Sequence, residues 1–475
     1  MFDFYRISAA KTEKVPADKV DKIYRLKRIE TFLTATFAYA LYYVCRLSMG
    51  VMKQPLIDSG LFTATQLGII GACLYWTYAV GKLVNGFLAD GANIKRFMAT
   101  GLLVSVGANM IMSVLGVSAV KGYLPVSALF LCFAVCWALN GWAQSMGAPP
   151  AIVSLSRWFP IKIRGTYYGF FSASHNIGEG LSFIFVGSIV AALGWRWGFF
   201  GAAIAGVFGL LIILLFLHDH TESEGLPPIE VVSGEVSQEE YNERREELLK
   251  EYENAKAAAR KETKLMQKAV IKNPRVWILA LSSAFMYMSR YAINEWGTIF
   301  LQETKGYELV EAAAIIGINP VFGIIGTVCG GWLSDILFKG DRKYPAFFAG
   351  VLEAIALALF LFGGPEKWIN VLAMVLFGIA IGVLIAFLGG LMAIDLVSRK
   401  ASGAALGIVG IASYAAAGLQ NVLTGFLLDN RPLMEGPNGA MIHNFSYVSW
   451  FWFGAAVISF LLPMLNWRRK TQDVL

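Results

Sequence analysis

Twelve apolar stretches, each long enough to cross a bilayer, follow one another along this chain of 475 residues. A spanning helix needs about 20 apolar residues, and helices are the simplest structures that satisfy their own backbone hydrogen bonds in hydrocarbon. The mean hydropathy of +0.57 also exceeds what a soluble protein of this length shows. The pattern therefore predicts an all-α membrane protein with twelve transmembrane helices, at residues 31–51, 66–88, 97–118, 125–148, 166–193, 195–217, 276–301, 312–336, 344–363, 368–393, 402–428 and 446–467.

Lysine and arginine residues are distributed unevenly between the two sides of these spans. Of the 40 basic residues, 31 fall on the side that holds both termini, six on the opposite side and three within spans. Lys53 is counted among the six. The positive-inside rule then predicts that both termini are cytoplasmic. The first 30 residues are basic and polar, without the apolar core of a cleavable signal peptide. Because the net charge of +7 lies in these flanking segments, no nucleic-acid partner is expected.

The chain divides into two apolar halves around one polar segment. We predict a cytoplasmic tail at residues 1–30, a six-helix bundle at 31–217, a cytoplasmic linker at 218–275, a second six-helix bundle at 276–467 and a cytoplasmic tail at 468–475. The charge-rich run from Gln238 to Lys268 is expected to form an exposed or amphipathic helix within the linker.

The two halves carry the same landmarks at the same spacing. Arg46 precedes Asp90 of the segment Gly86-Phe-Leu-Ala-Asp90 by 44 residues, and Arg290 precedes Asp335 of the segment Gly331-Trp-Leu-Ser-Asp335 by 45 residues. Such a match over a long interval indicates an internal repeat. We therefore expect Arg46 and Arg290 to lie at the same depth on facing sides of a central cavity.

Three basic residues within spans, Arg46, Lys82 and Arg290, suggest what this cavity binds. A charge at bilayer depth costs from about 2.5 to over 10 kcal/mol, so it marks a functional site by default. The planar fork of guanidinium donates paired hydrogen bonds to phosphate or carboxylate. We therefore predict an anion held by Arg46 and Arg290 and assisted by Lys82 and His175. Further candidates for the cavity wall are Tyr39, Tyr43, Tyr78, Tyr287, Tyr414, Gln420 and Asn421.

A structural interpretation of the same residues stays open. Glu179, Glu295 and Glu353 also fall within spans and could neutralise the arginines, and His175 could be a hydrogen-bonded core residue. Tyrosines in apolar helices are often interfacial, and Gln420 or Asn421 could join helices. The five cysteines lie almost entirely in apolar stretches, so neither a disulfide framework nor a metal site is predicted. No motif combines a nucleophile, a base and a metal, so we expect neither an enzyme nor a cofactor.

In each half, the Gly-x-x-x-Asp segment is followed by basic residues, which are Lys95 and Arg96 in the first copy and Lys339, Arg342 and Lys343 in the second. This arrangement resembles the loop signature of the major facilitator superfamily. The resemblance implies two parallel repeats that hold a substrate near the membrane midplane.

Several segments resemble one branch of that superfamily, the organophosphate:phosphate antiporters. They are Tyr39-Ala-Leu-Tyr-Tyr-Val-Cys-Arg46, Tyr78-Ala-Val-Gly-Lys82, Ser174-His-Asn-Ile-Gly178, Glu224-Gly-Leu-Pro-Pro-Ile-Glu230, Tyr287-Met-Ser-Arg-Tyr291 and Asn294-Glu-Trp296. The resemblance implies that the two arginines bind phosphate, that Lys82 and His175 assist, and that Tyr39, Tyr43, Tyr287 and Tyr414 surround the cavity. It also implies a bacterial inner membrane.

Some residues differ from those of the glycerol-3-phosphate exchangers, and these differences make glycerol 3-phosphate a less favoured substrate. Ala148 and Phe171 stand where those exchangers have tryptophans, and Pro320 replaces an acidic residue. The seventh span, with Ala292-Ile-Asn-Glu-Trp296 followed by Glu303-Thr-Lys-Gly306, is more similar to the hexose-phosphate carriers and sensors. Gln420 and Asn421 offer uncharged polar groups that could face sugar hydroxyls or equally form hydrogen bonds between helices.

We thus predict a monomeric carrier in membrane lipid that exchanges a sugar phosphate, glucose 6-phosphate first, for inorganic phosphate by alternating access. In the accompanying hypothesis, the anion bridges Arg46 and Arg290, whereas the unshielded like charges of the empty carrier resist closure. One alternative is a membrane sensor of external sugar phosphate that signals to a kinase. Others are a transporter of glycerol 3-phosphate or another organic anion, and a proton-coupled exporter.

Overall fold

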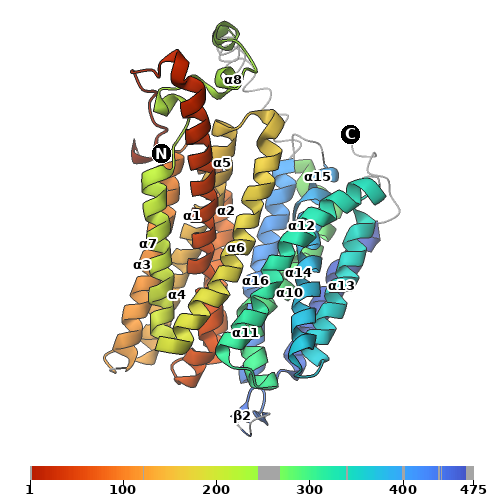
Figure 1. Ribbon diagram of the computed structural model, residues 1–475. Coiled ribbons are helices and arrows are strands. Elements are labelled where there is room, and N and C mark those ends of the chain that lie inside the picture. Colours follow the sequence, from red (N-terminus) through yellow and green to blue (C-terminus); the bar gives the residue numbers. More distant parts are fainter. Residues whose placement is uncertain are drawn as a thin grey trace.

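The computed structural model describes residues 3–120, 122–243, 268–338, 341–397, 402–436, 439 and 441–466. Two helical bundles stand side by side, one from each half of the chain (Figure 1). Eleven described helices are long and apolar enough to cross a membrane. The helix that begins at Val20 falls outside these eleven, but it runs through the first bundle beside them (Figure 1). The predicted all-α membrane fold is confirmed.

The N-terminal bundle follows the predicted spans closely. Its helices are α1 (Val20–Asp58), α2 (Ala64–Asp90), α3 (Ile94–Val120), α4 (Val126–Gln144), α5 (Ala148–Trp158), α6 (Ile161–Leu193) and α7 (Trp195–Phe216). The helix α1 begins eleven residues before the expected edge of the first span, so part of the predicted tail is helical. Within the predicted fourth span, α4 ends at Gln144. A new helix, α5, begins at Ala148 with prolines in its first turn.

The C-terminal bundle repeats this pattern with two interrupted spans. Its helices are α10 (Pro274–Lys305), α11 (Leu309–Ile316), α12 (Ile318–Leu337), α13 (Lys343–Phe362), α14 (Lys367–Ala386), α15 (Met392–Asp395), α16 (Ser402–Asp429) and α17 (Ser446–Leu461). The eighth predicted span is broken at Gly317, between α11 and α12. The tenth passes through a wide π turn, η4 (Phe387–Leu391), that contains Gly389 and Gly390.

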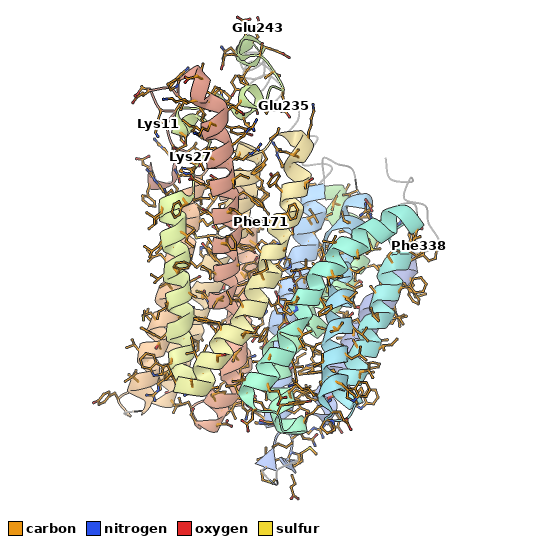
Figure 2. The ribbon with its side chains drawn as sticks, in the orientation of Figure 1. Lys11, Lys27, Phe171, Glu235, Glu243 and Phe338 are labelled. Atoms are coloured by element: carbon orange, nitrogen blue, oxygen red, sulfur yellow. The ribbon has the colours of Figure 1, made fainter. Side chains whose placement is uncertain are left out.

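Shorter elements cover the two ends of the bundles. At the end where α1 begins, called here the terminal end, lie η1 (Asp3–Tyr5), η2 (Ala17–Lys19), η3 (Glu222–Glu224) and α8 (Ile229–Val232). Figure 2 shows Lys11, Lys27 and Glu235 at this end, with Phe338 on the same side of the second bundle. The opposite, distal end carries the antiparallel pair β1 (Met434–Glu435) and β2 (Met441–Ile442) (Figure 1). The segment η6 (Leu462–Asn466) follows α17.

The first part of the predicted linker folds back onto the N-terminal bundle. The Val15 N–H donates to the Gly225 carbonyl over 3.0 Å, and Arg157 pairs with Asp219 at 2.5 Å. Gly225 has a φ of +76°, a backbone conformation that favours glycine. A hydrogen bond with His218 lowers the pKa of Glu224 to about 2. Most of the run from Gln238 to Lys268 and the whole tail at 468–475 lie outside the described residues.

The two bundles are joined closely toward the distal end. A Cβ at Gly68 of α2 would lie 2.4 Å from the Asn421 carbonyl oxygen of α16, and one at Gly425 would lie 2.2 Å from the Ala64 carbonyl oxygen. Only glycine permits backbones to approach this closely. Asp429 then accepts the Ala64 and Thr65 N–H groups at 3.1 and 2.7 Å, so a carboxylate of the C-terminal bundle caps a helix of the N-terminal one.

Candidate substrate-binding site

Arg46 lies within α1 with 1% of its surface exposed and with no carboxylate partner among the described residues. One guanidinium nitrogen donates to the Tyr291 hydroxyl over 3.3 Å, and Nε has no partner. Its Cζ lies 4.1 Å from the ring centroid of Tyr78 and 5.4 Å from those of Tyr43 and Tyr414. Aromatic faces attract a cation, but they do not cancel its charge. Arg46 is therefore a buried positive charge that an anion can neutralise.

Arg290 lies in α10 and, unlike Arg46, has an acidic partner. Its Nη2 is 2.8 Å from Oε2 of Glu179, and both side chains are buried. The second carboxylate oxygen of Glu179 accepts from Asn294 over 2.6 Å. Because Glu179 belongs to α6, the pair crosses from one bundle to the other. The expectation that both arginines are unshielded in the empty carrier is wrong for Arg290.

Tyrosine rings connect the two arginines. Tyr414 of α16 lies 4.6 Å from Tyr78, 5.3 Å from Tyr287 and 6.3 Å from Tyr291, measured between ring centroids. Tyr291 in turn lies between the two cations, since it accepts from Arg46 and its ring centroid is 5.4 Å from the Arg290 Cζ. The structure thus brings Arg46, Arg290 and four tyrosines from both bundles into one cluster. Hydroxyl groups at this position can donate to phosphate oxygens.

Lys82 and His175 lie at the margin of this cluster. The Lys82 Nζ is 5.4 Å from the ring centroid of Tyr414, and the His175 ring is 6.0 Å from that of Tyr43. Lys82 is exposed although it faces α16, whereas Tyr78, one turn nearer the distal end, is buried against that helix. A Cβ at Gly410, one turn from Tyr414 toward the terminal end, would meet no atom within 4 Å. The bundles are therefore in close contact on the distal side of the cluster, whereas α2 and α16 leave Lys82 and Gly410 uncovered toward the terminal end.

The remaining predicted residues are spread more widely. Tyr39 stacks on Phe171 of α6 at 5.4 Å and touches Tyr43 at 5.5 Å, and Figure 2 shows Phe171 on the half of α6 nearer the terminal end. Gln420 is buried and donates to Thr424 on its own helix over 2.9 Å, and Thr424 in turn accepts from Trp452 of α17. The structure therefore places Gln420 away from the tyrosine cluster.

A second buried ion pair lies between the cluster and the distal end. Lys53 Nζ is 2.8 Å from Oε2 of Glu295, with exposures of 0% and 2% for the two side chains. Lys53 also donates to Asn421 over 2.8 Å, and its Nζ lies 4.0 Å above the ring of Trp296. Tyr75 donates to the other oxygen of Glu295. Asn421 accordingly serves as a partner between helices in this structure.

The assignment of Lys53 to a segment outside the spans was wrong. The prediction ended the first span at residue 51, but α1 continues to Asp58, past Pro55, so Lys53 stays inside the bundle. Lys53 follows Arg46 by seven residues, which is two helical turns, so both point from the same face of α1. That spacing was the available signal. Glu179 was one of three acids expected to neutralise the arginines if these were structural, and the structure pairs it with Arg290. The choice of partner, and the positions of Tyr75 and Tyr291, had no comparable signal in the sequence.

Two bundles of spanning helices that hold buried cations between them and that are in close contact toward the distal end are the architecture of membrane transporters. The model of the Major Facilitator Superfamily matches residues 31–420. The chain belongs to this superfamily, which consists of membrane transporters and not of enzymes.

Relatives of the chain place it more narrowly. It is 32% identical to the "Probable hexose phosphate transport protein" of Chlamydia pneumoniae, over 83% of this chain and 84% of the relative. It is 31% identical to the "Glycerol-3-phosphate transporter" of Bacillus subtilis, over 88% and 90%. It is 27% identical to the "Membrane sensor protein UhpC" of Escherichia coli, over 95% and 97%. These relatives place the chain in the organophosphate:phosphate antiporter branch.

Proposed function

We propose that the chain is an organophosphate transporter that exchanges a hexose phosphate, with glucose 6-phosphate as the first candidate, for inorganic phosphate. The observation that carries this proposal is Arg46, a buried cation that has no carboxylate partner among the described residues and that lies among tyrosine side chains. Burying an unpaired charge costs several kcal/mol, and an anionic substrate in the site repays that cost. The phosphorylated sugars named for its relatives supply the substrate class.

The geometry supports a bridging role for the anion. Arg46 belongs to one bundle and Arg290 to the other, and Lys82 lies at the side that is accessible from the terminal end. A phosphate that enters from this end meets Lys82 first, then Arg46 and the tyrosines. We infer that the terminal end is cytoplasmic in a bacterial inner membrane, because the basic loops gather there. The structure then corresponds to a carrier that is open to the cytosol.

Alternating access follows from the placement of the contacts between bundles. Opening of the distal end requires that Asp429 leaves the start of α2 and that Lys53 separates from Glu295. Anion binding between Arg46 and Arg290 supplies a new link between the bundles at the midplane. We propose that this link lets the bundles rock about the occupied site, so that inorganic phosphate or the sugar phosphate leaves on the side opposite to its entry.

Uptake of labelled glucose 6-phosphate into proteoliposomes loaded with inorganic phosphate tests this function. Arg46→Lys and Arg290→Lys keep the charge but remove the planar fork, so we expect both to lower uptake at least tenfold. The control is Arg431→Lys, because Arg431 lies in the loop after α16, away from the cluster, and stacks on the ring of Tyr447 at the start of α17. Uptake that needs no internal phosphate would contradict the exchange mechanism, and uptake that survives both substitutions would contradict the role of the two arginines.

A sensor is the second candidate, because the similarity to UhpC extends over 95% of this chain. The same arginines would then bind external sugar phosphate, and a kinase would be the partner. Binding of glucose 6-phosphate without flux would favour the sensor. Flux of glycerol 3-phosphate in place of glucose 6-phosphate would change the substrate but keep the site.

A further inference from the structure

The two arginines occupy equivalent positions in the repeat, yet among the described residues Arg290 has a carboxylate partner and Arg46 has none. Arg290 pairs with Glu179 at 2.8 Å, whereas Arg46 meets only a hydroxyl and aromatic rings among the described residues. The repeat alone does not require this difference. An acid that neutralises one half of a symmetric cationic site changes the charge that the site presents to a substrate.

Glu179 is held toward the site by the opposite bundle. Its Oε2 accepts from Arg290 and its Oε1 from Asn294, and both donors belong to α10, whereas Glu179 belongs to α6. The side chain is 1% exposed, so water does not screen its charge. Glu179 therefore acts as a fixed negative charge at the position where a substrate anion meets Arg290.

The formal charges around the cluster can be counted from the described residues. Arg46, Lys82 and Arg290 oppose the single carboxylate of Glu179, which leaves two positive charges if histidine is counted as neutral. Lys53 and Glu295 cancel each other nearer the distal end. Glu353 accepts a hydrogen bond from Ser289 and is fully buried, at a separate place in the C-terminal bundle. A phosphate monoester with two negative charges therefore neutralises the site.

We infer that Glu179 is a specificity-determining residue that matches the site to doubly charged phosphate monoesters and disfavours phosphorylated acids with a third negative charge. This inference rests on the proposed function. A third charge on the ligand would remain uncompensated next to the Glu179 carboxylate, in surroundings where unscreened like charges repel strongly. Removal of the Glu179 charge leaves three positive charges, which suit such a ligand.

A matched pair of ligands tests the inference. Glucose 6-phosphate and 6-phosphogluconate share a phosphate ester on a six-carbon chain, but 6-phosphogluconate adds a carboxylate. We would measure competition of each ligand with labelled glucose 6-phosphate on the purified protein. In Glu179→Gln we expect the ratio of their affinities to shift at least tenfold toward 6-phosphogluconate. Glu179→Asp keeps the charge and should keep the ratio of the unsubstituted protein.

Glu353→Gln is the control for the loss of a buried carboxyl group, because Glu353 faces Ser289 and not the arginines. An unchanged ratio in Glu179→Gln, with glucose 6-phosphate still bound, would overturn the inference and leave the proposed function intact. A shift of the same size in Glu353→Gln would also overturn it, because the effect would not be specific to Glu179. If the unsubstituted protein binds neither glucose 6-phosphate nor inorganic phosphate, both the inference and the proposed function fall.

Discussion

Individual side chains inside the bundles show how this protein tolerates charge in an apolar interior. Lys53 and Arg290 each have a carboxylate at 2.8 Å, and further polar groups satisfy those carboxylates. Within the described part of the chain, the partners of Arg46 are tyrosine side chains. In a buried pair each charge offsets part of the desolvation cost of the other, whereas a single buried charge keeps its full cost. We therefore expect Arg46 to depend on a ligand, whereas Lys53 and Arg290 form ion pairs that link the two bundles.

Removal of one member of the Lys53 and Glu295 pair should destabilise the protein more than removal of both. Lys53→Met leaves an uncompensated carboxylate and Glu295→Gln leaves an uncompensated ammonium group, each at a cost of about 3–5 kcal/mol. The double substitution replaces the pair by neutral groups, so it should lie closer to the unsubstituted protein than either single substitution does. Thermal unfolding of the four proteins in detergent measures this difference. Additive losses in the double substitution would show that the two residues do not interact.

Helix ends and loops form the seal at the distal end. Thr63 and Gln66 make a capping box at the start of α2, and Asp429 at the end of α16 accepts two further N–H groups there. The loop before α17 is attached to α10 by His443, whose Nδ1 lies 2.9 Å from Glu303 and whose backbone N–H also donates to that carboxylate. The contacts of Asp429 and His443 thus lie at the ends of helices, and each joins two separate elements through a single side chain.

The link between His443 and Glu303 should make stability depend on pH in a defined direction. The hydrogen bond to Glu303 raises the pKa of His443 above its ordinary value of 6.5, with Asp429 and Asp58 adding to the effect. A raised pKa in the folded state means that the stabilisation is fully present below about 6.5 and is lost as the pH rises through the higher folded value. The difference in melting temperature between the unsubstituted protein and His443→Gln should therefore shrink between about pH 6 and pH 9. A difference that stays constant or grows over this range would contradict the assignment.

The molecule as a whole consists of two bundles that the distal contacts hold in one relative orientation. The contacts between the bundles lie on the distal side of the tyrosine cluster. They are the close backbone approaches at Gly68 and Gly425, the Asp429 cap and the ion pair of Lys53. Lys82 and Gly410, on the other side of the cluster, face open space. A carrier of this shape changes its accessible side by exchanging one set of contacts between bundles for another.

Loss of the Asp429 cap should shift the protein toward a state that is open at the distal end. Asp429→Ala removes both acceptors from the start of α2, at a cost of about 0.5–2 kcal/mol to the sealed state. A cysteine in place of Tyr287, in a chain whose five native cysteines are replaced, should then react several-fold faster with an impermeant maleimide added on the distal side. Asp395→Ala, which breaks a pair with Arg342 within one bundle, is the control. Equal rates in both variants would argue against Asp429 as a distal latch.

Much of the architecture was predictable because it depends on local properties of the chain. Each spanning helix satisfies its own backbone hydrogen bonds, so an apolar stretch of sufficient length is enough to predict it. Most described helices match the predicted spans to within about five residues, but α1 extends beyond its predicted span at both ends and the fourth span is divided between α4 and α5. The repeat and the three basic residues within spans were likewise visible along the chain. The breaks at Gly317 and at the π turn were not, because glycine and proline also occur in uninterrupted membrane helices.

The sequence by itself determined the membrane class, the two repeated halves and the cationic character of the site. Only the tertiary structure decided how that charge is distributed. Glu179 and Arg290 are 111 residues apart along the chain, and Lys53 and Asn421 are 368 apart. Whether such groups meet depends on how α1, α6, α10 and α16 pack against one another. An ion pair forms over a few ångströms, so packing between helices, and not spacing along the chain, decided that Arg290 is neutralised and Arg46 is not.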